Sequence, residues 1–87
     1  MDKKVVVLID SGINKLDFCD CLVGGKHFYV EENYVCCDDS FDDDNGHGSA
    51  CAYTIKSIFP ETQFYIIKIL DQNLETVYPV LEAALEH

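Results

Sequence analysis

The sequence feature that most constrains the fold is the uninterrupted apolar run Val5–Ile9, which leads directly into Asp10, Ser11 and Gly12. Consecutive β-branched and aliphatic residues are typical of a strand that is buried on both faces of a parallel sheet. The carboxyl ends of such strands form the edge of an α/β sheet where ligands and catalytic groups collect. We therefore predict a central parallel strand over residues 4–9 that presents Asp10 at its end.

Two further segments favour strands. Residues 22–30 are mostly apolar and contain a glycine pair, and they predict a second strand. The run Phe64–Leu70 is the strongest strand signal in the chain because it combines aromatic and β-branched residues. Between them, residues 31–46 carry seven of the sixteen acidic residues and are predicted to be an acidic loop.

Apolar residues recur at helical spacing in two places. The first predicts a helix over residues 46–58, with Asp44 or Asn45 capping its start and Pro60 ending it. The second predicts a helix over residues 77–85, with a proline in its first turn. The resulting order, β-β-α-β-α, predicts one α/β unit with a parallel sheet and flanking helices.

Composition narrows the classes of partner. A chain of 87 residues with 48% apolar residues is one small domain or part of a larger one, and it is too apolar to stay disordered. Its net charge of −10 excludes the basic face that nucleic acid or an anionic membrane needs. The sequence contains neither an apolar run long enough to span a membrane nor a recognisable signal peptide, so we expect a cytoplasmic location.

The five cysteines are an odd number and are expected to be reduced thiols in a reducing cell. A zinc site is the alternative, although its spacings depart from the usual Cys-x2-Cys pairs. Its ligands would be Cys19, Cys21, Cys36 and Cys37, with His27 as a further candidate. For the acidic loop, a calcium site is weighed against a solvated run of charge, and the loop lacks the distal glutamate of an EF-hand.

A second motif, Asn45-Gly46-His47-Gly48-Ser49, places a histidine between glycines at the start of the predicted helix. A histidine that transfers protons needs a fixed carboxylate at Nδ1, and Asp10 at a strand end would supply it. Gly46 and Gly48 would leave room for substrate around the ring. The alternative is structural, with Asp10 capping a turn and His47 bonded to backbone.

In this order, the two motifs resemble the Asp and His motifs of the subtilisin-like serine proteases. Leu22–Val30 is similar to that family's strand with paired glycines, and Pro60–Asp71 to the strand that follows its His helix. One departure is Ser49, where the family usually has threonine. The resemblance implies an α/β fold, hydrolysis of peptide bonds without a cofactor, His47 as general base and then acid, and Asp10 as the residue that orients it.

The serine motif of that family is absent after His47. Residues 1–87 are therefore expected to be the amino-terminal part of a peptidase domain, inactive alone and completed by a missing carboxyl-terminal half. Leu85–His87 fits either native helix or the remnant of an expression tag. Within the chain, Ser49 and Ser11 are expected to point away from His47. Cys51, one helical turn after His47, is expected to be a packed thiol, with a Cys–His dyad as the alternative.

Two functions of another class stay open beside the peptidase. One is a non-catalytic interaction module built on a truncated protease fold. The other is a receiver-like or nucleotide-binding α/β domain, which also begins with an apolar strand that ends in aspartate. The chain has no Gly-x-Gly-x-x-Gly motif and no phosphate-binding lysine motif, which disfavours the nucleotide-binding alternative.

Overall fold

The computed structural model describes residues 4–87 and consists of one four-stranded sheet with three helices. The strands are Val5–Asp10 (β1), Leu22–Glu31 (β2), Tyr34–Asp38 (β3) and Gln63–Lys68 (β4). The helices are Lys15–Phe18 (α1), His47–Ile58 (α2) and Tyr78–Glu86 (α3). The predicted α/β class is confirmed, and the strands and helices over 4–9, 22–30, 46–58, 64–70 and 77–85 are present with shifts of one or two residues at their ends.

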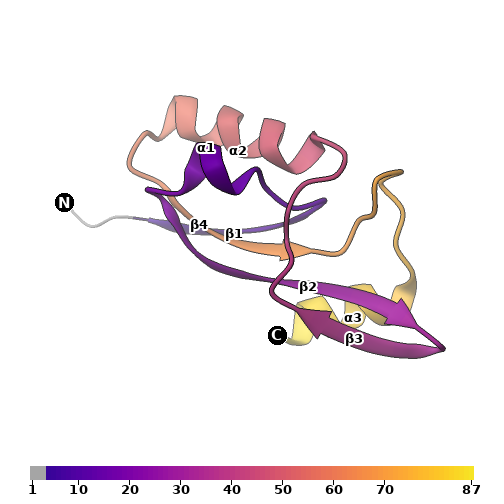
Figure 1. Cartoon of the computed structure of the whole chain (residues 1–87). Helices are drawn as coiled ribbons and strands as arrows, with labels where there is room; N and C mark the ends of the chain where they lie inside the picture. The colour runs from indigo at the N-terminus through magenta and orange to yellow at the C-terminus, as the bar shows by residue number, and fades with distance from the viewer. Residues whose placement is uncertain (1–3) are drawn as a thin grey trace.

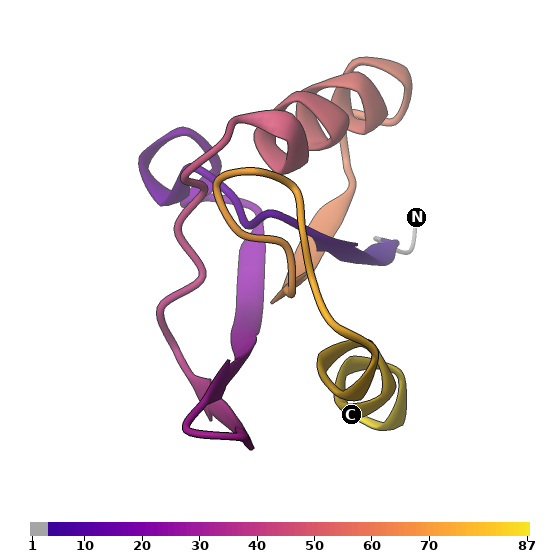
Figure 2. The same cartoon turned by 90° about the vertical axis from the view of Figure 1, so that its right-hand side faces the viewer.

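The strand order in the sheet is β1-β4-β2-β3. β4 pairs in parallel with both β1 and β2, whereas β2 and β3 pair antiparallel. Helices α1 and α2 lie on one face of the sheet and α3 lies on the other (Figure 1; Figure 2). The sheet is therefore mostly parallel and is covered by helices on both faces.

The main core lies between the sheet and the two helices α1 and α2. β4 is the central strand of its parallel part, and Phe64 and Ile66 are fully buried on the face that looks toward these helices. They pack in one cluster with Ala52 of α2 and Phe18 of α1. The ring of Phe18 also meets that of Phe64 edge to face, with centroids 5.9 Å apart. This packing holds α2 against the face of the sheet formed by β1 and β4.

The predicted loop over residues 31–46 is wrong in its first part. Tyr34–Asp38 forms β3, which pairs with β2 through a two-residue turn. Both turn residues, Glu32 and Asn33, have positive φ angles of 52° and 70°, as tight β-hairpins require. The order is thus β-α-β-β-α-β-α, because this hairpin and the single-turn helix α1 are added to the predicted elements.

The prediction that the first strand is central is also wrong, because β1 lies at the edge of the sheet. Its register with β4 pairs Val6 with Phe64 and Leu8 with Ile66, so one face of β1 reaches the main core. Val5 and Val7, on the other face, are 52% and 55% exposed. In the described part of the chain, only one face of the apolar run of β1 therefore packs in the main core.

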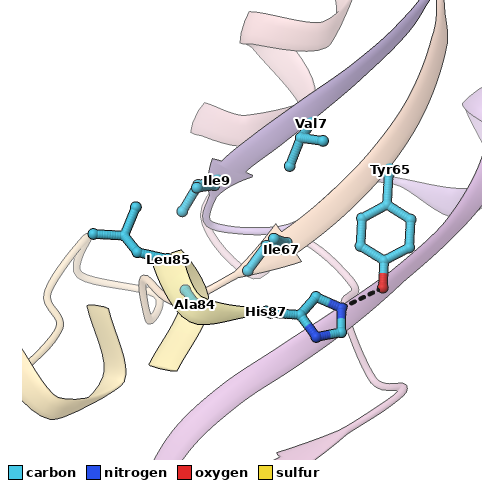
Figure 3. Close-up of a pocket in the computed structure, with 7 residues that line it drawn as sticks. All are labelled: Val7, Ile9, Tyr65, Ile67, Ala84, Leu85 and His87. Atoms are coloured by element: carbon cyan, nitrogen blue, oxygen red, sulfur yellow. Dashed lines mark hydrogen bonds between the residues drawn. The ribbon is translucent and has the colours of Figure 1, made fainter. Parts of the chain in front are cut away.

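Helix α3 covers the second face of the sheet, where Val80 and Ala84 are buried. A shallow depression beside it is lined by β1, β4 and the end of α3, as Figure 3 shows. Here Nε2 of His87 lies 2.7 Å from the hydroxyl of Tyr65. The helix runs through Leu85 to Glu86, so these residues continue α3 whatever their origin.

Candidate active site

The structure brings Asp10 and His47 into contact at the carboxyl end of β1. Side chains alternate between the two faces of a strand, so Asp10 shares its face with Leu8, the face covered by α2. His47 is the first residue of α2. Its Nδ1 lies 2.9 Å from Oδ1 and 3.0 Å from Oδ2 of Asp10. The expected proximity is therefore observed, and the catalytic roles of the two residues stay predictions.

Asp10 is held in place and His47 is left accessible. The side chain of Asp10 is 10% exposed, and the backbone N–H of Ser11 donates to its Oδ1 at 2.7 Å. The Asp10 carbonyl accepts from the backbone N–H of Ile69, which ties the end of β1 to the segment after β4. The side chain of His47 is 51% exposed, and no group within residues 4–87 hydrogen-bonds to its Nε2. One ring nitrogen of this half-exposed side chain is thus fixed by a carboxylate, while the other has no hydrogen-bond partner among the described residues, as a group that transfers protons needs.

A third acidic residue, Asp43, fixes the start of α2. Its Oδ1 accepts hydrogen bonds from the Ser11 hydroxyl and the backbone N–H groups of Asn45 and Gly46. Its Oδ2 accepts from both the backbone N–H and the hydroxyl of Ser49. The carboxylate thereby connects the turn after β1, which carries Asp10, with the helix that carries His47.

These contacts set the charge state of Asp43. Burial opposes ionisation, but the hydrogen bonds from Gly46, Ser49 and Ser11 outweigh it and hold the pKa of the Asp43 carboxyl well below its usual range. The sequence prediction missed this role, since it placed Asp43 in a solvated loop and gave the cap to Asp44 or Asn45. The cap position is Gly46. Oδ1 of Asn45, the residue before it, accepts a hydrogen bond from the backbone N–H of His47. The available signal was an acidic residue just before a Gly-His-Gly helix start.

The glycines on either side of His47 are required by the conformation and packing of the backbone. Gly46 has a φ of +103°, in the left-handed region that side chains rarely adopt. Gly48 is buried, and a Cβ at this position would lie 2.1 Å from the carbonyl oxygen of Gly12. The smallness of Gly48 is thus needed for α2 to approach the turn after β1, which corrects the interpretation that it leaves room for substrate.

The two serines near the site have hydroxyl groups engaged elsewhere. The Ser11 hydroxyl donates to Asp43 and accepts from the backbone N–H of Gly48 at 2.9 Å. The Ser49 hydroxyl donates to Asp43 and accepts from the backbone N–H of Asn14 at 3.0 Å. Neither hydrogen-bonds to His47, so neither is arranged as a nucleophile beside it.

Cys51 lies one turn along α2 from His47, with its Sγ 3.8 Å from Nδ1. Burial raises the pKa of the Cys51 thiol, and the negative charges of Asp10 and Asp43 raise it further. Since the thiolate is the reactive form, this environment favours a protonated, packed thiol over a Cys–His dyad. The sulfur also contacts the nitrogen that already faces Asp10, rather than the free Nε2.

The alternative metal sites are not assembled in the described residues. Within residues 4–87, the cysteines of the proposed zinc site and His27 do not form a group of three ligands. In the acidic segment, the Asp39 carboxylate pairs with Lys26 at 2.7 Å and that of Asp44 with Lys68 at 2.8 Å. Asp39 and Asp44 thus pair with lysines rather than with each other.

The structure thus combines an α/β unit with an aspartate at a strand end that contacts a histidine at a helix start. The sequence is similar to part of a protease. The chain is 39% identical over 77 residues to the minor extracellular protease Epr of Bacillus subtilis (strain 168), a match that takes in 78% of this chain and 11% of that protein. The chain thus spans about a ninth of the relative's length. No family model matches it.

Across residues 4–87, no helix is both long enough and apolar enough to cross a bilayer. All five cysteines are free thiols in the structure.

Proposed function

We propose that this chain is the Asp–His segment of a subtilisin-like serine peptidase. The observation that carries the proposal is the contact between the buried Asp10 carboxylate and Nδ1 of His47, whose half-exposed ring leaves Nε2 without a hydrogen-bond partner in residues 4–87. The similarity to the Bacillus protease and the order of the two motifs along the chain support it independently of that geometry. The substrate would be a peptide or protein.

In this proposal His47 works through Nε2. It takes the proton of a serine hydroxyl as general base and returns it to the leaving amine as general acid. Asp10 keeps the proton of the ring on Nδ1 and stabilises the imidazolium that forms. The hydrogen bond from the Ser11 N–H holds the carboxylate in the orientation that this role needs. The nucleophilic serine and the oxyanion-binding groups would come from a polypeptide segment outside this sequence.

The open edge of β1 is the place where that segment would pair. The strand has apolar depressions on both sides, one lined by Leu8 and α2 and the other by Val7, Ile9 and α3. A strand added beside β1 would cover the half-exposed Val5 and Val7 and complete the backbone pairing. It would also reach the end of β1 at which Asp10 and His47 lie.

We further propose that the chain works in a reducing compartment such as the cytoplasm. Five unpaired thiols are typical of proteins that are kept reduced, and oxidising compartments select against them. The relative is named an extracellular protease, so under this proposal the two proteins work in different compartments. The net charge of −10 disfavours anionic membranes and nucleic acid as partners.

The second candidate is a non-catalytic interaction module. The exposed apolar edge of β1 favours it as much as it favours a catalytic partner segment, because edge pairing needs no chemistry. The two candidates differ in whether His47 matters for the function. They are separated by an experiment that supplies the missing serine.

That experiment replaces the aligned segment of the Bacillus protease with this chain and measures hydrolysis of a fluorogenic peptide by the purified chimera. We expect an active chimera whose turnover falls about 10⁶-fold in His47→Ala and about 10⁴-fold in Asp10→Asn, the losses that subtilisin shows for its histidine and aspartate. Cys19→Ser, at an exposed position, is the matched control and should retain activity. A chimera that folds and is inactive, or whose activity survives His47→Ala, contradicts the peptidase proposal and favours the interaction module.

A further inference from the structure

Three donor groups of different chemistry meet at the carboxyl end of β1. The carboxylate of Asp10, Nδ1 of His47 and Sγ of Cys51 offer one ligand atom each, and these atoms all lie within 4.8 Å of one another. Within residues 4–87 this is the only group of three His, Cys, Asp or Glu side chains that comes so close. The proposed peptidase chemistry uses Asp10 and His47 and gives no role to the thiol of Cys51.

The spacing of these atoms is near that of a tetrahedral metal site. Zinc bonds of about 2.0 Å to oxygen and nitrogen and about 2.3 Å to sulfur separate neighbouring ligand atoms by about 3.3 to 3.7 Å. In the structure Nδ1 lies 2.9 Å from the nearer oxygen of Asp10 and 3.8 Å from Sγ of Cys51. Small rotations of the His47 and Cys51 side chains would therefore bring both atoms to bonding distance of one ion, while Asp10 stays anchored by the Ser11 N–H.

We propose that Asp10, His47 and Cys51 bind a thiophilic divalent cation, Zn²⁺ or its analogue Cd²⁺. A mixed oxygen, nitrogen and sulfur set suits these ions, whereas Ca²⁺ and Mg²⁺ take oxygen ligands. Three protein ligands leave the fourth position to solvent, and the half-exposed ring of His47 gives the ion access. The acidic surface of the chain, with its net charge of −10, attracts cations to the site.

The proton balance of binding is simple. The Cys51 thiol releases one proton to solvent when its sulfur binds the metal as thiolate. The proton on Nδ1 of His47 is exchanged through solvent to Nε2, so the ring stays neutral and binds through Nδ1. The ion would then lie between Asp10 and His47 in place of their hydrogen bond. Because Nε2 would carry a proton, a metal-bound ring could not act as a general base, and the site would be inhibitory.

This site rests on the geometry of three side chains and does not depend on the peptidase role. Its test is accordingly a binding measurement on the whole 87-residue chain. Co²⁺ is added to the reduced protein, and its visible absorption reports tetrahedral coordination, while ultraviolet charge-transfer absorption reports a metal–thiolate bond. Zn²⁺ is then titrated in to displace Co²⁺ and give the affinity.

We expect one equivalent of Co²⁺ with both spectral features. Cys51→Ser and His47→Ala should each weaken binding by more than the roughly 10- to 100-fold that loss of an outer-shell partner costs. The matched control, Cys37→Ser, removes an exposed thiol and should leave the spectrum unchanged. Circular dichroism checks the fold of each variant, and Cys51→Ala and His47→Gln replace any variant that does not fold.

The possible results decide the proposal. A spectrum that survives Cys51→Ser or His47→Ala overturns it, as does one that Cys37→Ser removes, because the metal would then bind the other thiols. Absence of any tetrahedral Co²⁺ spectrum in the native chain also overturns it. None of these results bears on peptide hydrolysis, so failure of the metal site and failure of the peptidase proposal are distinguishable.

Discussion

The strongest test of how this site is built is the substitution Asp43→Asn. The Asp43 carboxylate accepts five hydrogen bonds, three at Oδ1 and two at Oδ2, and the donors come from the turn after β1 and the start of α2. An asparagine keeps one acceptor oxygen, and its amide group would face the two donors of Ser49. At least two bonds are therefore lost, and the others lose the charge that strengthens them.

The expected loss of stability follows from these contacts. Hydrogen bonds to charged groups contribute about 1.5 to 3 kcal/mol each when buried, and because Asp43 is partly exposed we expect a total of about 3 kcal/mol. A chain of this size has a free energy of unfolding of about 4 to 13 kcal/mol, so the loss is a large fraction of it. The melting temperature should fall by about 12 to 24 °C.

The assay is urea denaturation of the whole chain, followed by circular dichroism. The matched control is Asp42→Asn, which removes the same charge at an exposed neighbour whose carboxylate makes no hydrogen bond to residues 4–87. We expect Asp42→Asn to change the free energy of unfolding by less than about 0.5 kcal/mol. If the two variants are equally stable, the carboxylate of Asp43 does not hold α2 in place and our account of the site is wrong.

The same pair of proteins gives a pH test. The pKa of Asp43 is lowered by folding from its ordinary value of 3.8, so ionised Asp43 stabilises the fold at pH values above that. Its contribution is lost as the pH falls through the lower folded value. The difference in free energy of unfolding between the native chain and Asp43→Asn should be constant near neutral pH and shrink below about pH 4. A difference that stays constant down to acid pH contradicts the low pKa.

Three further predictions concern the site. The 87-residue chain alone should hydrolyse no fluorogenic peptide above background, because it brings no nucleophile to His47, and turnover that vanishes in His47→Ala would contradict this. A variant with Cys51 as its sole cysteine should react with a thiol reagent at least about tenfold more slowly than one that retains only the exposed Cys37, and rapid reaction at neutral pH would revive the Cys–His dyad. Gly48→Ala should lower the free energy of unfolding by about 3 kcal/mol, because its Cβ would meet a backbone carbonyl. Gly46→Ala, with open space around its Cβ, should lower it by about 1 to 2 kcal/mol because of its positive φ. Urea denaturation that reverses this order would refute the close approach of Gly48 to the turn after β1.

The parts of the fold that could be predicted are those whose cause is local in sequence. The apolar run of β1, the aromatic and β-branched run of β4 and the helical period of α2 each continue for a whole element, and each element lies where its pattern places it. The contact between Asp10 and His47 then follows from topology, since both residues stand at element ends on one face of the sheet.

The parts that escaped prediction depend on partners distant in the chain. β3 is short and surrounded by acidic residues, and pairing with β2 decides its conformation. Its turn, Glu32-Asn33, is a weaker hairpin signal than Asn-Gly or Asp-Gly. The role of Asp43 depends on Ser11, which lies 32 residues earlier, and no periodicity in the acidic segment shows that contact.

The position of β1 connects the fold to the proposed function. The sequence of this strand is apolar on both faces, as a central strand requires, yet the described part of the chain pairs it on one side only and leaves Val5 and Val7 half exposed. An edge strand of this kind is unfavourable in water unless another strand covers it. β1 also carries Asp10 at its end, so a segment that pairs with β1 would come to lie beside His47. Under the proposed function, this edge is therefore where we expect a serine to reach Asp10 and His47, and burial of the two valines would contribute to holding it there.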